Sequence, residues 1–191
     1  MVRASTPVPV DPPVRLAEAV CSVIAEHGLE GASIRKVASA AEVSIGAVQH
    51  HFPTKDDMLV AAFEHIVRAG SERVARLPLG EDTADNLSRV LRELLPLDAA
   101  RRREARVYVA FAARAATQPR LAAVQQATLT GIVDRLARVL EADAAHARAE
   151  AELLLAVADG LMFDAITAPQ SFDPDRTAGL LDLYLRRLLG S

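Results

Sequence analysis

The stretch "AEVSIGAVQHHFPTKDDM", residues 41–58, carries the signals that decide the fold. Ser44 can cap the N-terminus of a short helix, on which Val48 and Phe52 lie at helical spacing and point inward. A proline ends that helix, and the Thr-x-x-Asp pattern of residues 54–57 resembles a capping box that starts the next one. The stretch therefore predicts two consecutive helices with a sharp break between them.

The residues before this stretch complete a helix-turn-helix pattern. From Leu16 the apolar residues recur at helical spacing, and His27 and Gly28 supply a C-terminal cation and a stop. Ser33 can cap a short helix whose end lies about three residues before the helix that starts at Ser44. Two short helices at this separation are typical of helix-turn-helix DNA-binding units.

The predicted helix 44–52 presents an outward face with few charges. Its outward positions are Ile45, Gly46, Ala47, Gln49, His50 and His51. Small residues let a helix backbone enter the major groove, Gln49 can bond adenine through two hydrogen bonds, and methyl groups can contact thymine. Adjacent histidines on a helix point about 100 degrees apart, so they cannot share one metal ion. The pattern indicates DNA binding, with Lys55 at a phosphate.

Composition sets the class of protein. The chain has 191 residues, half of them apolar, few aromatic residues and no tryptophan, which favours an all-α protein of one or two domains. No apolar run approaches the roughly 20 residues that cross a bilayer, and the single Cys21 fits a reducing cytoplasm. The net charge is -3, so DNA binding must come from a local patch such as residues 33–55.

The segment "GASIRKVASAAEVSIGAVQHHFPTKDDML", residues 31–59, resembles the DNA-binding segment of the TetR family of transcriptional regulators. The resemblance is specific over residues 15–63. Residues 94–122 and the later "ADGL" are similar to the C-terminal region of the BetI-related group. This chain departs from the family pattern in two places, where Glu42 replaces the usual turn glycine and Gln49 replaces the usual tyrosine.

The resemblance implies a set of DNA contacts, carried over by position. It implies phosphate contacts at Ser33, Ser44, His51 and Lys55. It implies groove contacts around Arg35, Ile45, Ala47, Gln49 and His50, and we include Lys36 and Gly46 in the same surface.

We expect about nine helices in three parts. Residues 1–14 are rich in proline and predict a disordered tail. Residues 15–60 predict the helix-turn-helix domain, and residues 61–191 a larger helical domain for effector binding and dimerisation. Breaks between the later helices are expected at residues 77–80, 96–98, 118–119, 142–147 and 169–173.

The last two predicted helices are apolar nearly all round, so both of their sides need cover. One side can serve the core of the chain and the other a symmetric partner, which resembles the dimerisation of the family. The residues that we expect at the dimer interface are Leu154, Ala158, Leu161, Ala165, Leu181 and Leu185.

The effector site is less well defined by the sequence. The family lines its ligand cavity with the middle helices, and the matching candidates here are Phe63, Leu91, Tyr108, Phe111, Gln126, Met162 and Phe163. The aromatic residues and Met162 also fit a plain core at helical spacing. Asp159 on an apolar helix either recognises a cationic effector or is a polar group satisfied within the protein or at an interface.

Two other classes of protein compete with a regulator. An enzyme with a di-iron centre would need paired Glu-x-x-His elements, and the sequence contains no such element, no phosphate-binding glycine loop and no Gly-x-Ser-x-Gly. A helical adaptor without DNA binding does not explain the weakly charged face or Lys55. The expected function is therefore a ligand-responsive regulator, a repressor that binds palindromic double-stranded DNA as a homodimer and needs no cofactor or metal. The sequence does not define its effector, operator or target genes.

Overall fold

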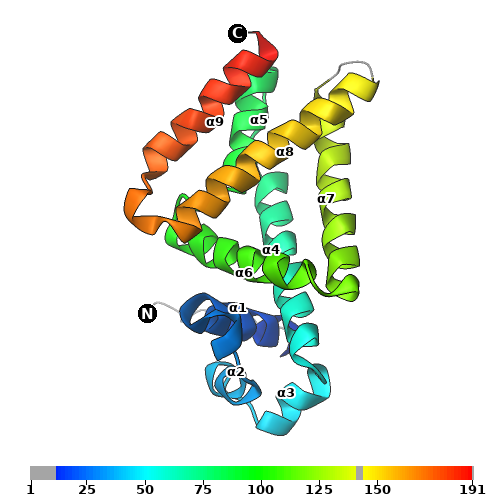
Figure 1. Cartoon of the computed structure of the whole chain (residues 1–191), viewed down its shortest axis with the longest axis vertical. Coiled ribbons are helices and arrows are strands. Elements are labelled where there is room, and N and C mark those ends of the chain that lie inside the picture. Colours follow the sequence, from blue (N-terminus) through cyan, green and yellow to red (C-terminus); the bar gives the residue numbers. More distant parts are fainter. Residues whose placement is uncertain (1–11, 141–143, 191) are drawn as a thin grey trace, which may run out of the picture.

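The computed structural model describes residues 12–140 and 144–190, and these residues form α-helices joined by short connections (Figure 1). The elements in order are α1 (Pro12–Gly31), α2 (Ile34–Ala40), α3 (Ile45–His51), α4 (Lys55–Ala75), α5 (Thr83–Arg92), α6 (Ala99–Ala115), α7 (Pro119–Val139), α8 (Ala144–Thr167), a 3-10 turn η1 (Pro169–Ser171) and α9 (Pro174–Leu189). The all-α prediction with about nine helices is confirmed for the described part of the chain.

The predicted caps form. The Ser33 side chain accepts a hydrogen bond from the Lys36 amide at 3.3 Å and thereby starts α2. Thr54 and Asp57 form a reciprocal capping box, in which the Thr54 hydroxyl accepts from the Asp57 amide at 3.1 Å and the Asp57 carboxylate accepts from the Thr54 amide at 3.0 Å. Each cap satisfies amides that would otherwise lack partners at a helix start.

The start and end of α1 differ in detail from the prediction. The predicted tail covers residues 1–14. Residues 1–11 lie outside the described residues, and residues 12–14 form the first turn of α1. Pro13 is compatible with this because the first turn of a helix needs no amide donor there. Gly28 interrupts the helix with φ 67° and ψ 174°, which matches the predicted stop, and the chain adds one more turn to Gly31.

The predicted breaks at residues 77–80, 96–98, 118–119 and 169–173 all fall at helix ends. The break at 142–147 is shorter than expected, because α8 already includes Ala144, while residues 141–143 lie outside the described residues. Among the described helices, none combines the length and the apolar character that crossing a membrane requires.

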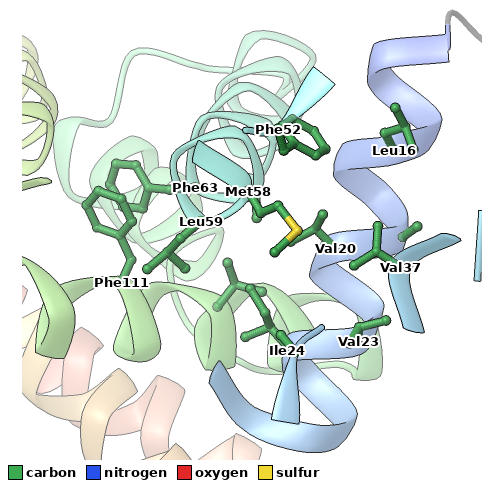
Figure 2. Close-up of a cluster of buried hydrophobic side chains, with 14 of the residues drawn as sticks. Leu16, Val20, Val23, Ile24, Val37, Phe52, Met58, Leu59, Phe63 and Phe111 are labelled. Atoms are coloured by element: carbon green, nitrogen blue, oxygen red, sulfur yellow. The ribbon is translucent and has the colours of Figure 1, made fainter. Parts of the chain in front are cut away.

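One hydrophobic core joins α1–α4 to α6. Val20 and Val37 meet Met58 and Leu59 of α4, and the rings of Phe63 and Phe111 stack at 3.9 Å between centroids (Figure 2). This core also takes in one residue of α7. The helix-turn-helix unit therefore shares its core with α6, and α4 lies in the middle of it.

A second core lies at the other end of the molecule, where α5, α7, α8 and α9 meet (Figure 1). Its fully buried residues include Leu87 and Leu91 of α5, Leu154 of α8, and Leu181 and Leu185 of α9. Helices α7 and α8 pack side by side, and α9 packs mainly on α5. Helix α6 contacts α1, α4, α7 and α8, so it connects the two cores.

The turn between α2 and α3 contains an unusual backbone conformation. Glu42, at φ 56°, has a positive φ without being a glycine. An L-residue in this region carries a steric cost of about 1–2 kcal/mol that glycine avoids. Arg15 of α1 helps to hold the turn, because its Nη2 donates to the Ala41 carbonyl at 3.1 Å.

We predict that Glu42→Gly raises the free energy of unfolding by about 0.5–1 kcal/mol, since glycine relieves the left-handed strain but loses more entropy on folding. Urea denaturation of the full chain measures this change. Glu18→Gly, an exposed position inside α1, is the matched control and should instead lower stability by about 1 kcal/mol. A loss of stability with Glu42→Gly would show that the turn is not strained.

Candidate nucleic-acid interface and polar cluster

Helix α3 is anchored on one side and open on the other. The Ser44 hydroxyl accepts from the Ala47 amide at 3.1 Å, and Val48 and Phe52 are buried in the first core. The opposite side presents Ile45, Gly46, Gln49, His50 and His51, which are all exposed, while Ala47 is half-buried. Ile45 is 45% exposed although it is a large apolar residue. The outward side of α3 is therefore open, with an apolar side chain among its polar ones.

The cationic residues of the predicted patch flank this face. Ser33, Arg35 and Lys36 lie at the start of α2, where Ser33 is the N-cap. Lys55 opens α4, and its Nζ lies 3.7 Å from the carboxylate of Glu30, which is 98% exposed. Such exposed pairs contribute at most about 1 kcal/mol, so Lys55 can exchange its partner for a phosphate. The predicted DNA-binding residues therefore gather at one end of the molecule.

Ion pairs connect the start of α4 to α6 and α7. Arg114 Nε donates to Asp56 at 3.1 Å, and Arg120 Nη1 lies 2.7 Å from Asp57. The hydrogen bond from the Thr54 hydroxyl, followed by that from Arg120, holds the pKa of Asp57 below its usual value. Arginines of the same chain pair with both carboxylates, so the negative charge beside Lys55 is offset.

The other end of α4 is held more firmly. The guanidinium of Arg73 makes two parallel hydrogen bonds to Glu104 of α6, at 2.8 and 2.6 Å, and a third to Glu93 at 2.7 Å. Parallel bonds of this kind fix direction as well as distance. Helix α4 is therefore fastened to α6 near both of its ends, by Arg73 and by Asp56.

A polar cluster lies among apolar residues where α6, α7 and α8 meet. The Tyr108 hydroxyl donates to Asp159 Oδ2 at 3.2 Å. The Oε1 atom of Gln125 is buried and has no hydrogen-bond partner. Burial raises the pKa of Asp159 to about 6, and the hydrogen bond from Tyr108 only partly opposes this effect. Burial and the nearby Asp159 also raise the pKa of Tyr108, so this phenol stays protonated.

The described residues contain no group of three or more histidine, cysteine, aspartate or glutamate side chains that could hold a metal ion. The rings of His50 and His51 lie edge to face at 5.7 Å between centroids. Cys21 is half-buried, and burial raises the pKa of its thiol to about 12, so it is not a nucleophile.

Sequence families match both ends of the chain. Residues 16–62 match the family described as bacterial regulatory proteins, tetR family, and residues 83–190 match the family described as BetI-type transcriptional repressor, C-terminal. The chain belongs to the TetR family. The recognition made on the sequence is thus confirmed, and the chain is a transcriptional regulator and not an enzyme.

Relatives of known name and structure agree with this TetR assignment. The regulator PksA of Bacillus subtilis is 31% identical over 85% of this chain and 82% of its own length. A transcriptional regulator from Rhodococcus sp. RHA1 is 46% identical and superposes with a TM-score of 0.87 over 93% of this chain and 96% of that one. A regulator from Saccharomonospora viridis, solved in complex with choline, is 22% identical with a TM-score of 0.80 over 91% and 95% of the two chains, which shows the shared fold.

The structure separates the residues that TetR resemblance suggested for an effector site. Phe63 and Phe111 are fully buried in the first core, whereas Leu91 belongs to the second core. Met162 is buried and Phe163 is 52% exposed. Of the predicted set, Tyr108 alone belongs to the polar cluster.

Gln126, which the sequence analysis placed among the effector-site candidates, lies on the surface of α7. It is exposed and its Nε2 donates to Thr130 at 3.3 Å, whereas the neighbouring Gln125 points inward. The sequence did not distinguish these two glutamines, because both are polar and only packing shows which one faces α6 and α8. Sequence reasoning therefore missed Gln125, whose buried Oε1 atom has no hydrogen-bond partner.

The structure places most of the expected dimer residues of this TetR chain in its own core. Five of them are buried inside the single chain, namely Leu154, Ala158, Ala165, Leu181 and Leu185, and Leu161 is half-buried. The five buried side chains are covered by the chain itself, whereas Leu161 keeps part of its surface open. Because α8 and α9 are apolar nearly all round, the sequence pattern did not show which side faces inward. The exposed apolar residues of these helices are Leu153, Phe163, Leu180 and Leu183.

We predict that Asp159→Asn stabilises the protein at neutral pH. The folded-state pKa of Asp159 is raised to about 6 from 3.8, so above pH 6 the buried carboxylate is charged in both states and opposes folding. As pH falls below that value the folded state takes up the proton first and its stability rises. Asparagine removes the buried charge but keeps an acceptor for Tyr108, which should add about 2–3 kcal/mol at neutral pH.

Urea unfolding at fixed protein concentration, above and below pH 6, measures this difference. Asp134→Asn, an exposed position on α7, is the control and should change stability little. If Asp159→Asn destabilised the protein at neutral pH, the carboxylate would have a structural role that its burial does not explain.

Proposed function

We propose that this chain is a homodimeric repressor that acts in the cytoplasm, binds palindromic double-stranded operator DNA and is released by a small-molecule effector. The observation that carries the proposal is the exposed, weakly charged face of α3, which Ser44 caps and Val48 and Phe52 anchor. In this proposal residues 15–60 form the DNA-binding domain and residues 61–191 the effector-binding and dimerisation domain. The TetR family assignment supports each part of it.

Docking α3 in the major groove assigns distinct roles to its neighbours. Gln49 faces outward where a side-chain amide can contact adenine through two hydrogen bonds, and Ile45 can contact a thymine methyl group. Ser33, Ser44 and Lys55 lie at helix starts, where hydroxyls, amides and the ammonium group meet phosphates. The phosphate contacts would position the dimer and the groove contacts would select the sequence.

We predict that Lys55→Ala weakens binding to all DNA sequences to a similar degree, since a phosphate contact carries no sequence information. The slope of log affinity against log salt should fall by about 1 for each phosphate that the protein no longer neutralises. Gel shifts on the protein's own promoter and on unrelated DNA, over a range of salt, measure both effects. Arg138→Ala, an exposed position on α7, is the charge-matched control and should leave the slope unchanged.

Gln49→Ala provides the contrast within this experiment. It should relax the preference at one base pair by roughly 1–3 kcal/mol and leave the salt slope unchanged. An unchanged salt slope with Lys55→Ala would place Lys55 outside the DNA interface. If Gln49→Ala weakened the affinity for all DNA sequences equally, Gln49 would contact the DNA backbone and not a base.

The dimer interface that we propose is the exposed apolar face of α8 and α9. Leu153 and Phe163 on α8 are 55% and 52% exposed, and Leu180 and Leu183 on α9 are 43% and 38% exposed. Gly160 lies on the same face of α8, one turn before Phe163, and has open space beside it, so a partner helix can approach closely there. An apolar face of this kind on two adjacent helices needs cover, and a second copy supplies it symmetrically.

We predict that Leu153→Glu yields folded monomers, because a charge on the proposed face would have to be buried without a partner. Sedimentation measures the oligomeric state and circular dichroism the helix content. Leu79→Glu is the matched control, since Leu79 is 54% exposed in the connection between α4 and α5, away from this face. A folded dimer with Leu153→Glu would exclude this face as the interface.

In this proposal, α4 transmits the effect of the bound effector to the DNA-binding domain and so releases the protein from DNA. This helix begins beside the proposed DNA contacts at Lys55 and is fastened to α6 by Arg73 and by Asp56. A ligand that shifts α6 or α7 must therefore shift α4 as well. Half-sites lie about 34–36 Å apart or a multiple of this distance, so a small change in the separation of the two α3 helices takes one of them out of its groove. The ligand needs no contact with DNA.

A further inference from the structure

We propose that the cluster of Tyr108, Gln125 and Asp159 binds an organic cation that carries N–H donors, such as a primary amine or an amidinium, in preference to a quaternary ammonium ion. This inference rests on the proposed effector-responsive function and specifies the chemical class of the effector. The cluster does not include the exposed Gln126, and it combines residues of three helices, α6, α7 and α8.

The cluster has more acceptors than donors. The single hydroxyl proton of Tyr108 is used in the bond to Asp159 Oδ2 at 3.2 Å. The Gln125 amide acts as a donor toward the Tyr108 oxygen, since it lowers the pKa of that phenol. This leaves the buried Gln125 Oε1 without any donor. An unpaired buried acceptor costs about 1–3 kcal/mol, so a ligand that donates to it gains that amount.

The cluster also lacks a positive charge. The influences on the pKa of Asp159 are its burial and the bond from Tyr108, with no arginine or lysine among them. A buried carboxylate normally has a cationic partner, and the arginines of the described chain that form ion pairs do so with other acids. A cationic ligand would supply the missing charge.

Apolar residues surround the cluster. The Phe63 ring lies 6.1 Å from the Tyr108 ring between centroids and stacks on Phe111. Met162, which is buried, follows Asp159 on α8 within about one turn. These neighbours favour a ligand with a small apolar or aromatic body attached to its charged group.

The donor requirement decides between types of cation. A quaternary ammonium ion can pair with Asp159 but has no N–H for Gln125 Oε1, which would stay unsatisfied. An amine or amidinium carries N–H donors for both acceptors. An anion would be repelled by Asp159, and a neutral alcohol would leave the charge of the Asp159 carboxylate unpaired.

Calorimetry on the full-length protein near neutral pH tests this choice with four probes that share a phenyl group. Benzylamine and benzamidine carry N–H donors and a positive charge, benzyltrimethylammonium carries the charge alone, and benzyl alcohol carries neither N–H donors nor charge. We expect both donor cations to bind at least about tenfold more tightly than the other two probes, a difference of about 1.4 kcal/mol. Equal or tighter binding of benzyltrimethylammonium would overturn the inference, as would the failure of both donor cations to bind at millimolar concentration.

Variants connect this binding to the named residues. Asp159→Asn should weaken benzylamine binding at least about tenfold, and the urea unfolding described above checks that the variant is folded. Gln125→Leu should weaken the binding of benzylamine and benzamidine and reduce the ratio of their affinities to that of benzyltrimethylammonium. A purely structural role of Gln125 would not change this ratio. Gln126→Leu and Asp134→Asn are the matched exposed controls and should bind as the parent chain does. Parent-like binding by both cluster variants would place the site elsewhere.

Gel shifts with the same samples separate this inference from the proposed function. Salt-dependent promoter binding without amine binding would overturn the inference and leave the DNA-binding function standing. Amine binding by a protein that never binds promoter DNA would keep the site and contradict the repressor. Amine binding that depends on Asp159 and lowers promoter affinity would support both.

Discussion

The stacking of Phe63 on Phe111 is the contact on which the arrangement of this molecule depends. It lies where α4 meets α6, in a core that belongs to both the helix-turn-helix unit and α6, and the two rings are fully buried. The ion pairs of Arg73 and Asp56 fasten the same two helices on either side of the stack. Because apolar cores repack in discrete steps and do not deform freely, α4 and α6 behave as one body. The proposed DNA-contacting surface and the proposed ligand-sensing domain can thus be coupled without a flexible hinge between them.

The polar cluster beside this core weakens the fold instead of strengthening it. A carboxylate whose burial raises its pKa to about 6 destabilises the folded state at neutral pH, and the unpaired Gln125 oxygen adds to that effect. Features of this kind persist when they serve recognition. A ligand that supplies a positive charge and hydrogen-bond donors removes both destabilising effects, and the free energy recovered adds to its affinity. The same logic applies to the exposed leucines and phenylalanine of α8 and α9, because apolar side chains gathered on two helices indicate a surface that another molecule covers.

Much of the fold could be predicted because it depends on local chemistry. Ser33, Ser44 and Thr54 start helices through bonds that span three residues, and such bonds form wherever the chain has that sequence. The outward face of α3 followed from two buried positions, Val48 and Phe52, at fixed helical spacing. The resemblance to TetR regulators rested on these same positions and was confirmed by the sequence families that match the chain.

The sequence by itself therefore determined the helices, their caps, the helix-turn-helix unit and the family. Only the tertiary structure decided which sides of α8 and α9 are covered, so that Leu154 and Leu181 lie in the core and Leu153 and Leu180 lie outside. Only packing chose Gln125 over its neighbour as the inward side chain. The physical reason is the sequence separation of the interacting residues. A helix cap or a helical period depends on residues three or four apart, whereas the orientation of a helix that is apolar all round depends on helices distant in the sequence.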